Sequence, residues 1–377
     1  MKFQPKENIA WIDLLRIIAC VLVVISHSCD PYVAQLDNIR PEFLSGAIIG
    51  SFMRISVPLF VMITGILSLP IRHEMGTFYR KKIGRIAIPI AIWSLLLPLI
   101  YFAYFQFFSS ASPAAASTDF SIGATLSRMW TFVFNFNYTT IPLWYLYMLI
   151  GLYLIMPIVS AWLKQATQKD IKLFLYIWIA TLIIPYLKML LPLIGYNGPF
   201  GSVTLFGVCD WNTYGSFYYV SGFIGYIVLA YYLVQFPFKW SLKKTLAICL
   251  PTFAVGYAIT TVGFILTQKY YPGDFAALEI VWYFTGINVF MMTVSMFLIV
   301  QKINIKPSKT LSHLASCTFG IYLCHFVFVQ MGYDMINRFS EVPPAVRIFM
   351  IAIVATIISY GVVVVLKTNK ITKRFVD

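Results

Sequence analysis

An arginine and a histidine lie in phase near the start of the chain, inside a stretch apolar enough to cross a bilayer. Residues 11–28 are mostly apolar, yet they contain Asp13, Arg16 and His27. An ionisable side chain in hydrocarbon costs at least about 3 kcal/mol, so these residues are functional candidates by default. Arg16 and His27 are eleven residues apart, almost three helical turns or roughly 16 Å. We expect them on one helical face, with Asp13 one turn below Arg16 and able to steady its guanidinium.

The chemistry open to such a pair is proton transfer or nucleophilic attack by the imidazole, with positive charge supplied by the guanidinium. Two more polar residues lie inside expected membrane spans, namely Arg54 and His325. His27 and His325 are about 16 and 15 residues into spans that run in the same direction, so we expect them at similar depth. For Arg54 and His325, a purely structural hydrogen bond to a neighbouring helix is an equally good interpretation.

The composition predicts an all-α, polytopic membrane protein. The chain of 377 residues is 60% hydrophobic, 17% aromatic and only 11% charged, far outside the averages of soluble proteins. Apolar stretches of about 20 residues, the length that crosses hydrocarbon, recur along the chain. They give ten expected transmembrane helices, at 11–29, 43–68, 83–108, 142–163, 170–193, 214–235, 244–267, 280–301, 310–331 and 345–366. We expect residues 1–377 to form one membrane domain without an additional soluble domain, and the first span to be retained rather than cleaved.

The net charge of +14 is explained by topology rather than by nucleic-acid binding. Alternate connections between the spans carry 20 and six Lys or Arg residues, and the richer set lies in the cytoplasm by the positive-inside rule. Both termini belong to the richer set, so we expect both in the cytoplasm. Two connections on the opposite side, 109–141 and 194–213, are long and mix aromatic with small polar residues, which favours an extracytoplasmic substrate.

A basic cluster marks the cytoplasmic entry to the third expected span. Arg80, Lys81, Lys82 and Arg85 place four cations within six residues. Such a cluster either anchors the helix beside anionic lipid headgroups or binds phosphate groups, and both interpretations stay open. The six cysteines lack metal-ligand spacing, and soluble-enzyme motifs are absent, so we expect no metal and no permanently bound cofactor. Asp13 is the one acidic residue well inside an expected span, which weakens a cation-driven transporter.

These residues lie in motifs that resemble those of the acyltransferase-3 family of bacterial membrane O-acyltransferases. Arg16 and His27 match the family's pattern of arginine, ten residues and histidine. Four later blocks resemble its other motifs: Arg54-Ile-Ser-Val-Pro-Leu-Phe, with Thr64 where serine is usual; Lys82-Ile-Gly-Arg85, with lysine in the first place; Leu143-Trp144-Tyr145-Leu146, with Pro142 replacing a histidine; and Ser316 to His325, which includes Tyr322. The resemblance covers essentially the whole chain. Around Phe217 it looks closest to the branch that O-acetylates enterobacterial common antigen.

The resemblance implies transfer of an acyl group, usually acetyl, from cytoplasmic acyl-CoA (acetyl-CoA) to a hydroxyl of a lipid-linked or surface glycan, at the bacterial cytoplasmic (inner) membrane. His27 and Arg16 would be catalytic, His27 either as general base or as an acyl-bearing nucleophile. The residues of the supporting polar site would be Asp13, Arg54, His325, Trp144, Ser316 and Tyr322, and the CoA phosphates would bind Arg80, Lys81, Lys82 and Arg85. The alternative is a transporter or flippase for a glycolipid or small solute, because ten spans with a polar interior fit it equally well.

Overall fold

The computed structural model describes residues 10–34, 40–110, 112–131, 134, 137–196, 205–209, 212 and 214–377. Within these residues the chain is helical and contains no strand, and the sole β-type pairing there is an isolated bridge between Cys209 and Asn212. The expected all-helical class is therefore confirmed.

Nine helical segments of the described chain are long and apolar enough to cross a membrane. They are Ala10–Val33, Pro41–Ser68, Met75–Phe107, Tyr138–Gln165, Gln168–Leu190, Leu242–Tyr270, Ile280–Lys302, Lys309–Ile336 and Pro344–Thr368. The expected span at 214–235 instead forms a 3-10 helix, η5 (Gly215–Val220), followed by α10 (Ile224–Gln235). Because the 12 residues of α10 are fewer than the roughly 20 that cross hydrocarbon, the number of ten spans stays a prediction, as does the cytoplasmic location of the termini.

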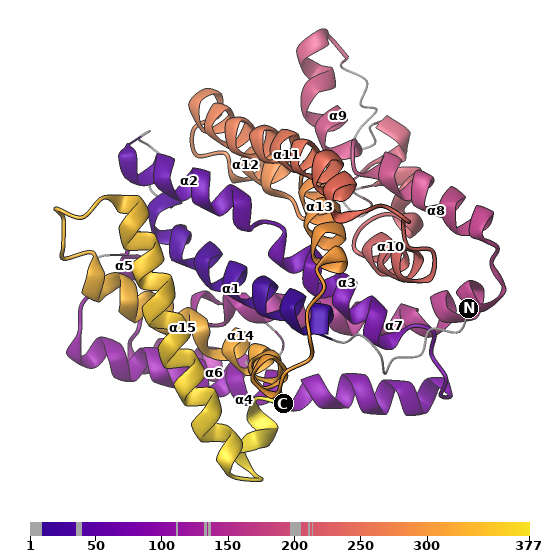
Figure 1. The fold of residues 1–377 in the computed structure, drawn as a ribbon. Helices are drawn as coiled ribbons and strands as arrows, with labels where there is room; N and C mark the ends of the chain where they lie inside the picture. Colours follow the sequence, from indigo (N-terminus) through magenta and orange to yellow (C-terminus); the bar gives the residue numbers. More distant parts are fainter. Residues whose placement is uncertain are drawn as a thin grey trace. The chain divides into compact units, whose positions relative to one another are not determined.

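The chain divides into two compact units, each assembled from segments far apart in the sequence (Figure 1). The N-terminal unit comprises the described residues of 8–56, 73–154 and 305–377, and the middle unit comprises those of 57–72 and 155–304. Every residue expected in the functional site belongs to the N-terminal unit, so that unit positions the site.

The N-terminal unit is built around α14, which packs against both α1 and α15. Small residues allow this close packing, as is usual between membrane helices: a Cβ on Gly320 would lie 2.7 Å from the Val363 side chain. The Cys20 thiol on α1 also donates to the Thr318 carbonyl of α14, at 3.6 Å. The elements of this unit are α1 (Ala10–Val33), α2 (Pro41–Met53), α4 (Met75–Phe107), α5 (Pro113–Ala116), α6 (Ile122–Thr131), η2 (Tyr138–Leu143), the first half of α7 (Trp144–Gln165), α14 (Lys309–Ile336), α15 (Pro344–Thr368) and η6 (Thr372–Phe375).

The second expected span is broken rather than continuous. α2 ends at Met53 and α3 (Ser56–Ser68) begins three residues later, so that Arg54 caps the C-terminal end of α2. Pro58 explains the break, because its ring removes the hydrogen bond to the carbonyl four residues earlier, that of Arg54, and clashes with it. Proline is tolerated in the first turn of the new helix.

The connection 109–141 is mostly helical where it is described, rather than a loop. It contains α5, α6 and η2. Asn137 starts η2 with a capping box, in which its side chain accepts from the Thr139 backbone N–H at 3.0 Å while the Thr140 hydroxyl accepts from the Asn137 backbone N–H at 3.1 Å. Such reciprocal caps satisfy the backbone groups that a helix start leaves unpaired, and they are a local sequence signal.

The middle unit packs α11 against α13. The Asn288 amide, which is fully buried on α13, donates to the Thr260 hydroxyl of α11 at 2.8 Å and to the Val281 carbonyl at 2.7 Å. The elements of this unit are α3, the second half of α7, α8 (Gln168–Thr181), α9 (Ile184–Leu190), η3 (Leu191–Ile194), η4 (Leu205–Gly207), η5, α10, α11 (Leu242–Tyr270), α12 (Phe275–Trp282) and α13 (Ile287–Lys302).

Gly225→Ala is expected to destabilise the middle unit. Trp178 is fully buried, donates to the Gly222 carbonyl at 2.8 Å and lies against Gly225, where a Cβ would collide with its indole ring. Such overpacking typically costs about 1–3 kcal/mol, so the thermal unfolding midpoint of the detergent-solubilised protein should fall. Gly151→Ala is the matched control, because no described atom beyond its own stretch of α7 lies within 4 Å of its Cβ position. Equal midpoints for the two variants would contradict this packing.

Candidate active site

His27 is held by a carboxylate from its own helix. Its Nδ1 lies 2.7 Å from Asp30 Oδ2, one turn further along α1. A carboxylate accepts hydrogen bonds, so Nδ1 carries a proton, and in the neutral form of the ring the lone pair that a base needs is on Nε2. The Asp30 side chain is 47% exposed and that of His27 is 19% exposed. Because a half-exposed polar pair contributes little to stability, the main effect of Asp30 is to fix the orientation and tautomer of the ring.

His325 is the second imidazole of the site. It is fully buried on α14, and its Nδ1 lies 2.7 Å from the Tyr322 carbonyl oxygen. A carbonyl only accepts, so the proton is on Nδ1 and Nε2 bears a lone pair. That Nε2 is buried and has no hydrogen-bond partner among the described residues. A buried polar atom left unpaired costs about 1–3 kcal/mol, which makes it a candidate for contact with a bound molecule.

The structure brings the two imidazoles together. The centroids of the His27 and His325 rings are 5.2 Å apart, and Phe326 packs edge-on against His27, also at 5.2 Å between centroids. The sequence predicted equal depth for the two histidines but not their contact. In the tautomer that its partner selects, His325 Nε2 cannot donate a hydrogen bond to a developing oxyanion. It is suited instead to accept one, from a hydroxyl or from a protonated His27 ring.

Tyr322 links α14 to the start of α7. Its hydroxyl donates to the Pro142 carbonyl, and its ring lies 5.9 Å from His325 and 5.6 Å from Tyr145 between centroids. Trp144 begins α7, is half-buried and meets Tyr145 edge-on at 6.3 Å between centroids. Tyr322 therefore contacts the imidazole pair, whereas Trp144 is connected to it through two intervening rings.

A second polar network lies beside the imidazole pair and was not expected from the sequence. The Tyr138 hydroxyl donates to Gln330 Oε1 at 2.7 Å, and Gln330 Nε2 donates to the Ser110 hydroxyl at 2.6 Å. Ser110 donates in turn to Asp334 Oδ1 at 2.6 Å. The Tyr138 ring packs on Phe326, the residue that contacts His27. Asp334 is only 6% exposed because α14 continues to Ile336, beyond the expected end of that span at residue 331.

Arg16 and Asp13 form a loose ion pair near the other end of α1. Arg16 Nη1 lies 3.7 Å from Asp13 Oδ1, and the Ser312 hydroxyl donates to Asp13 Oδ2 at 3.0 Å. Asp13 is buried, with 6% exposed, while 31% of the Arg16 side chain is exposed. The carboxylate is thus held from two sides, and it leaves part of the guanidinium open to a further partner.

Part of the basic cluster on α4 lies near Arg16. The positive charge of Arg16 interacts repulsively with the charges of Arg85 and Lys82. The Nζ atom of Lys82 also lies 5.9 Å from the centroid of the Tyr153 ring. Arg80 and Lys81 are exposed, and the contact of Lys81 is with His73, at 3.5 Å. Arg16, Lys82 and Arg85 thus bring three positive charges together. In these contacts only the Asp13 carboxylate compensates them, and this excess of positive charge favours binding of an anion.

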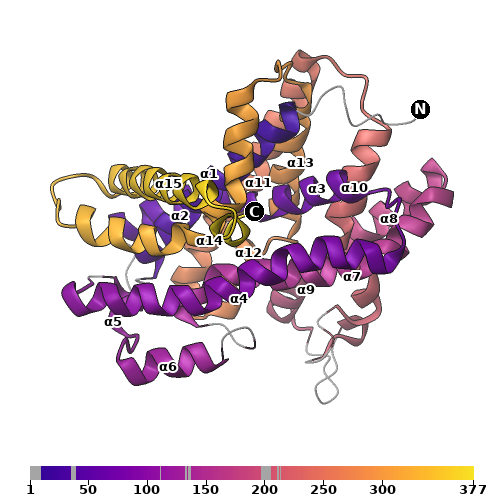
Figure 2. The same ribbon diagram turned by 90° about the horizontal axis from the view of Figure 1, so that it is seen from below.

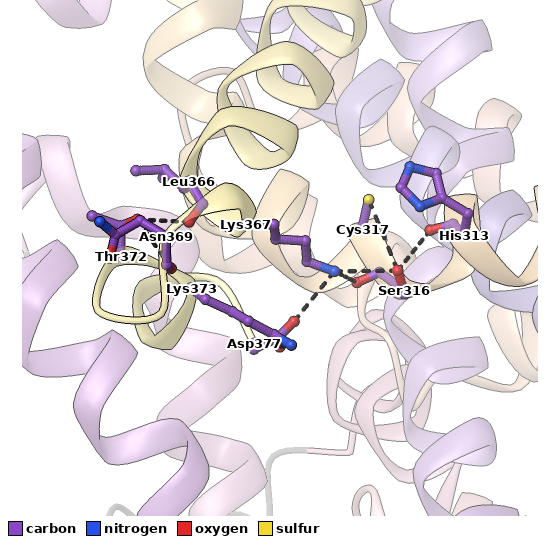
Figure 3. A network of polar contacts seen from close by, with 9 residues as sticks. All are labelled: His313, Ser316, Cys317, Leu366, Lys367, Asn369, Thr372, Lys373 and Asp377. Carbon is purple, nitrogen blue, oxygen red and sulfur yellow. Dashed lines mark hydrogen bonds and ion pairs between the residues drawn. The ribbon is translucent and has the colours of Figure 1, made fainter.

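Ser316 lies away from the imidazoles, in a network that anchors the end of the chain (Figure 3). It is exposed, nine residues or two and a half turns from His325 on α14. Lys367 Nζ donates to the Ser316 carbonyl at 2.7 Å and to its hydroxyl at 3.2 Å, and Lys367 also pairs with Asp377 at 3.2 Å. Arg54 is half-buried at the end of α2.

Asp30 is the functional candidate that sequence reasoning missed. Its signal was present, because a carboxylate three residues after a histidine on a helix faces the same side. Its position near the end of the expected first span, 11–29, instead suggested an ordinary loop residue. Helix α1 continues to Val33, and that extra turn brings Asp30 into contact with His27. Among the described residues no group of three or more His, Cys, Asp or Glu could hold a metal ion.

The protein therefore has several apolar helices long enough to cross a membrane. Among them lie the imidazole pair of His27 and His325 and, near the other end of α1, the cations Arg16, Lys82 and Arg85. These features define a multi-pass membrane protein with a polar interior. The family model described as an acyltransferase domain, that of the acyltransferase-3 family, matches residues 9–364. The match covers nearly all of the 377 residues, and the chain belongs to this family, which supports transferase activity. No curated protein and no solved structure is detectably similar to the chain.

Proposed function

We propose that this protein is a membrane O-acyltransferase that moves an acyl group, acetyl in the simplest case, from cytoplasmic acyl-CoA to a hydroxyl of a surface or lipid-linked glycan. The observation that carries the proposal is the His27–Asp30 pair, whose geometry leaves Nε2 of His27 free as a base. The same helix carries Arg16, which lies near Lys82 and Arg85. Helix α1 thus carries a residue suited to anion binding, Arg16, near one end and a residue suited to accept a proton, His27, near the other.

In the direct mechanism, His27 Nε2 accepts the proton of the acceptor hydroxyl while that oxygen attacks the thioester carbonyl. The carbon–sulfur bond then breaks, and the imidazolium returns its proton to the departing CoA thiolate. Asp30 stabilises the imidazolium through Nδ1 until the proton on Nε2 is transferred. Positioned general-base catalysis of this kind typically contributes about 10²–10⁴-fold in rate.

In the alternative mechanism, His27 Nε2 attacks the thioester itself and CoA leaves before the acceptor arrives. The thiolate that leaves takes a proton from solvent, and the acyl group is carried on the imidazole. In the second step the acceptor oxygen attacks the acyl carbon, the carbon–nitrogen bond breaks, and the released Nε2 takes up the hydroxyl proton and returns it to solvent. Both routes need the same tautomer, because each uses the Nε2 lone pair. Ping-pong kinetics with two substrates distinguishes the second route from the first.

The donor would bind with its phosphates at Lys82 and Arg85 and its pantetheine arm running past Arg16 toward His27. Lys and Arg at the entry of α4 suit phosphate groups, whose charge they neutralise. The exposed Arg80 and Lys81 are then peripheral and add to the attraction of an anionic donor over distance. Cytoplasmic termini, as the distribution of Lys and Arg predicts, place this basic end where acyl-CoA is found.

Removing two charges from the donor site is expected to weaken donor binding more than catalysis. The double variant Lys82→Ala with Arg85→Ala should raise KM for acyl-CoA by about 100-fold, at roughly 1.5 kcal/mol for each of two charge-assisted bonds, with kcat changed less. The control is Arg80→Ala with Lys81→Ala, which also removes two charges of the cluster but leaves Lys82 and Arg85, the two that interact electrostatically with Arg16, in place. Equal effects of the two double variants on KM would contradict the assignment of the phosphates to Lys82 and Arg85.

A transporter without acyl chemistry is the competing function, and reconstitution separates the two. Purified protein in liposomes, given radiolabelled acetyl-CoA on the side of the termini, should release CoA and transfer label to a glycan supplied on the other side. A transporter would move the glycan without a change of mass. Comparison of envelope glycans by mass spectrometry, from cells with and without the intact chain, then identifies the acceptor and tests the resemblance to the branch that modifies enterobacterial common antigen. The same cells show whether the protein is in the inner membrane.

A further inference from the structure

Helix α6 presents a row of large apolar side chains that nothing in the described protein covers. Ile122, Leu126 and Trp130 are spaced four residues apart and therefore lie on one helical face. Their exposed fractions are 64%, 58% and 85%. One flank of the helix is packed, with Thr125 only 2% exposed. In water such a contiguous apolar face would mark an interaction surface.

The helix lies alongside α4 and runs antiparallel to it (Figure 2). Just before α6 begins, Phe120 stacks on Phe105 at 4.1 Å between ring centroids, near the end of α4. At the other end of α6, Met129 and Trp130 line a groove of about 470 Å³ together with Leu95 of α4. Thr131 and Phe134 complete its lining. Between Phe120 and Trp130 the chain therefore runs along α4 from the level of Phe105 to the level of Leu95, ten residues nearer the start of that helix.

The depth reached by α6 follows from the length of α4. Leu95 is ten residues beyond Arg85, which is about 15 Å along the helix axis. The hydrocarbon core of a bilayer is about 30 Å thick. If the cations of α4 mark one edge of that core, Leu95 and the neighbouring Trp130 lie close to its middle, and Phe105 lies close to the far edge.

The single cation of α6 is arranged as a membrane location requires. Arg128 folds back toward the start of the helix, where it donates to the Asp119 carbonyl at 2.5 Å and lies 5.5 Å from the centroid of the Phe120 ring. Its charge is therefore carried away from the middle of the bilayer, as expected of a snorkelling arginine. The backbone N–H and hydroxyl of Ser121 donate to the Asp119 carboxylate and lower its pKa, which keeps this anion charged at the surface end.

We propose that α6 is a re-entrant helix embedded in the leaflet opposite the basic end, and that the hydrocarbon chains of bilayer lipid cover its Ile122–Leu126–Trp130 face and enter the groove beside Leu95. The apolar face continues the exposed surface of α4, where Leu99 is 41% and Phe107 82% exposed, so one lipid-facing surface includes both helices. The contacts of Phe120 with Tyr138, and of Tyr138 with Phe326, connect this element to His27.

Fluorescence quenching of Trp130 in proteoliposomes tests the proposal independently of any enzymatic activity. The full chain and its Trp130→Phe variant are reconstituted in phosphatidylcholine brominated at carbons 6,7 or 11,12, and the difference between their emissions isolates Trp130. We expect brominated lipid to remove more than half of this difference signal, with the 11,12 positions at least as effective, and aqueous iodide to leave it unchanged. Quenching by iodide would place α6 in water. Protection from both quenchers would mean that protein covers the face, and either result overturns the proposal.

Cysteine labelling provides a second measurement that does not depend on Trp130. All six native cysteines are unpaired and buried, so an introduced thiol is the reactive one. Ser121→Cys at the surface end should react at least tenfold faster with a membrane-impermeant maleimide than Leu126→Cys, and detergent should abolish the difference. Equal rates before detergent is added would overturn the re-entrant placement.

Discussion

His27→Ala is expected to abolish acyl transfer, with kcat reduced by at least about 10³-fold, within the range that positioned acid–base groups contribute. The ring removed is the one whose Nδ1 is held by Asp30 at 2.7 Å, which leaves the lone pair of the neutral ring on Nε2. The neighbouring His325 is a poor replacement, because its ring is fully buried and its Nδ1 is held by a neutral carbonyl rather than a carboxylate, so this bond does not compensate the charge of a buried imidazolium. The measurement is acyl-CoA turnover in proteoliposomes containing equal amounts of folded protein.

His313→Ala is the matched control for this variant. His313 is an exposed histidine whose Nε2 lies 3.2 Å from the Tyr360 hydroxyl, in the network that holds Ser316 and the end of the chain. We expect near-normal turnover from this variant. If His27→Ala inserted normally and retained wild-type turnover, the base would have to be another group and the proposed mechanism would be wrong.

Asp30→Asn should lower kcat by about 10²–10⁴-fold while KM for acyl-CoA changes little. An amide can donate as well as accept, so it can stabilise the wrong tautomer, with the proton on Nε2 and no lone pair toward the acceptor. The loss of a carboxylate behind a catalytic histidine costs up to about 10⁴-fold in the Ser-His-Asp enzymes for this reason. The phosphate contacts proposed for the donor lie at the other end of α1, which is why donor affinity should be preserved.

The control for Asp30 is Asp119→Asn, which removes a carboxylate that bonds to Ser121 rather than to a histidine. It should leave kcat unchanged. Asp30→Glu should recover part of the rate, because the acceptor-only chemistry is kept and only the length of the side chain differs. A purely structural role for Asp30 would instead lower folded yield and affect KM and kcat alike, and that result would remove Asp30 from the mechanism.

Local periodicity determined much of the candidate site in advance. The eleven-residue interval between Arg16 and His27 is a property of one helix, and α1 is continuous over both residues. The same holds for the three-residue step from Asp13 to Arg16, which the structure shows as an ion pair. Membrane class was equally accessible from the sequence, because only long apolar segments satisfy their backbone inside a bilayer. These features depend on contacts within a single element.

Features that depend on two elements were predictable only in part. The sequence predicted that His27 and His325 lie at equal depth in the membrane, which allows a contact between them. The contact itself results from the packing of α14 against α1. Ser316 belongs to the same motif as His325, but it lies two and a half helical turns away and on another side of α14, where it contacts Lys367. Arg80 and Lys82 are two residues apart, yet Arg80 is exposed whereas Lys82 is half-buried and interacts electrostatically with Arg16. Adjacent residues on a helix point in different directions, so a shared motif does not imply a shared site.

The sequence by itself determined that this chain is a helical membrane protein with an in-phase arginine and histidine on its first helix. The tertiary structure decided which other side chains join them. It brought His325 to His27, extended α1 far enough for Asp30 to contact the ring, and folded the expected loop at 109–141 into α6 beside α4. The physical reason is that helix periodicity is encoded over a few residues, whereas the pairing of helices depends on complementary surfaces hundreds of residues apart.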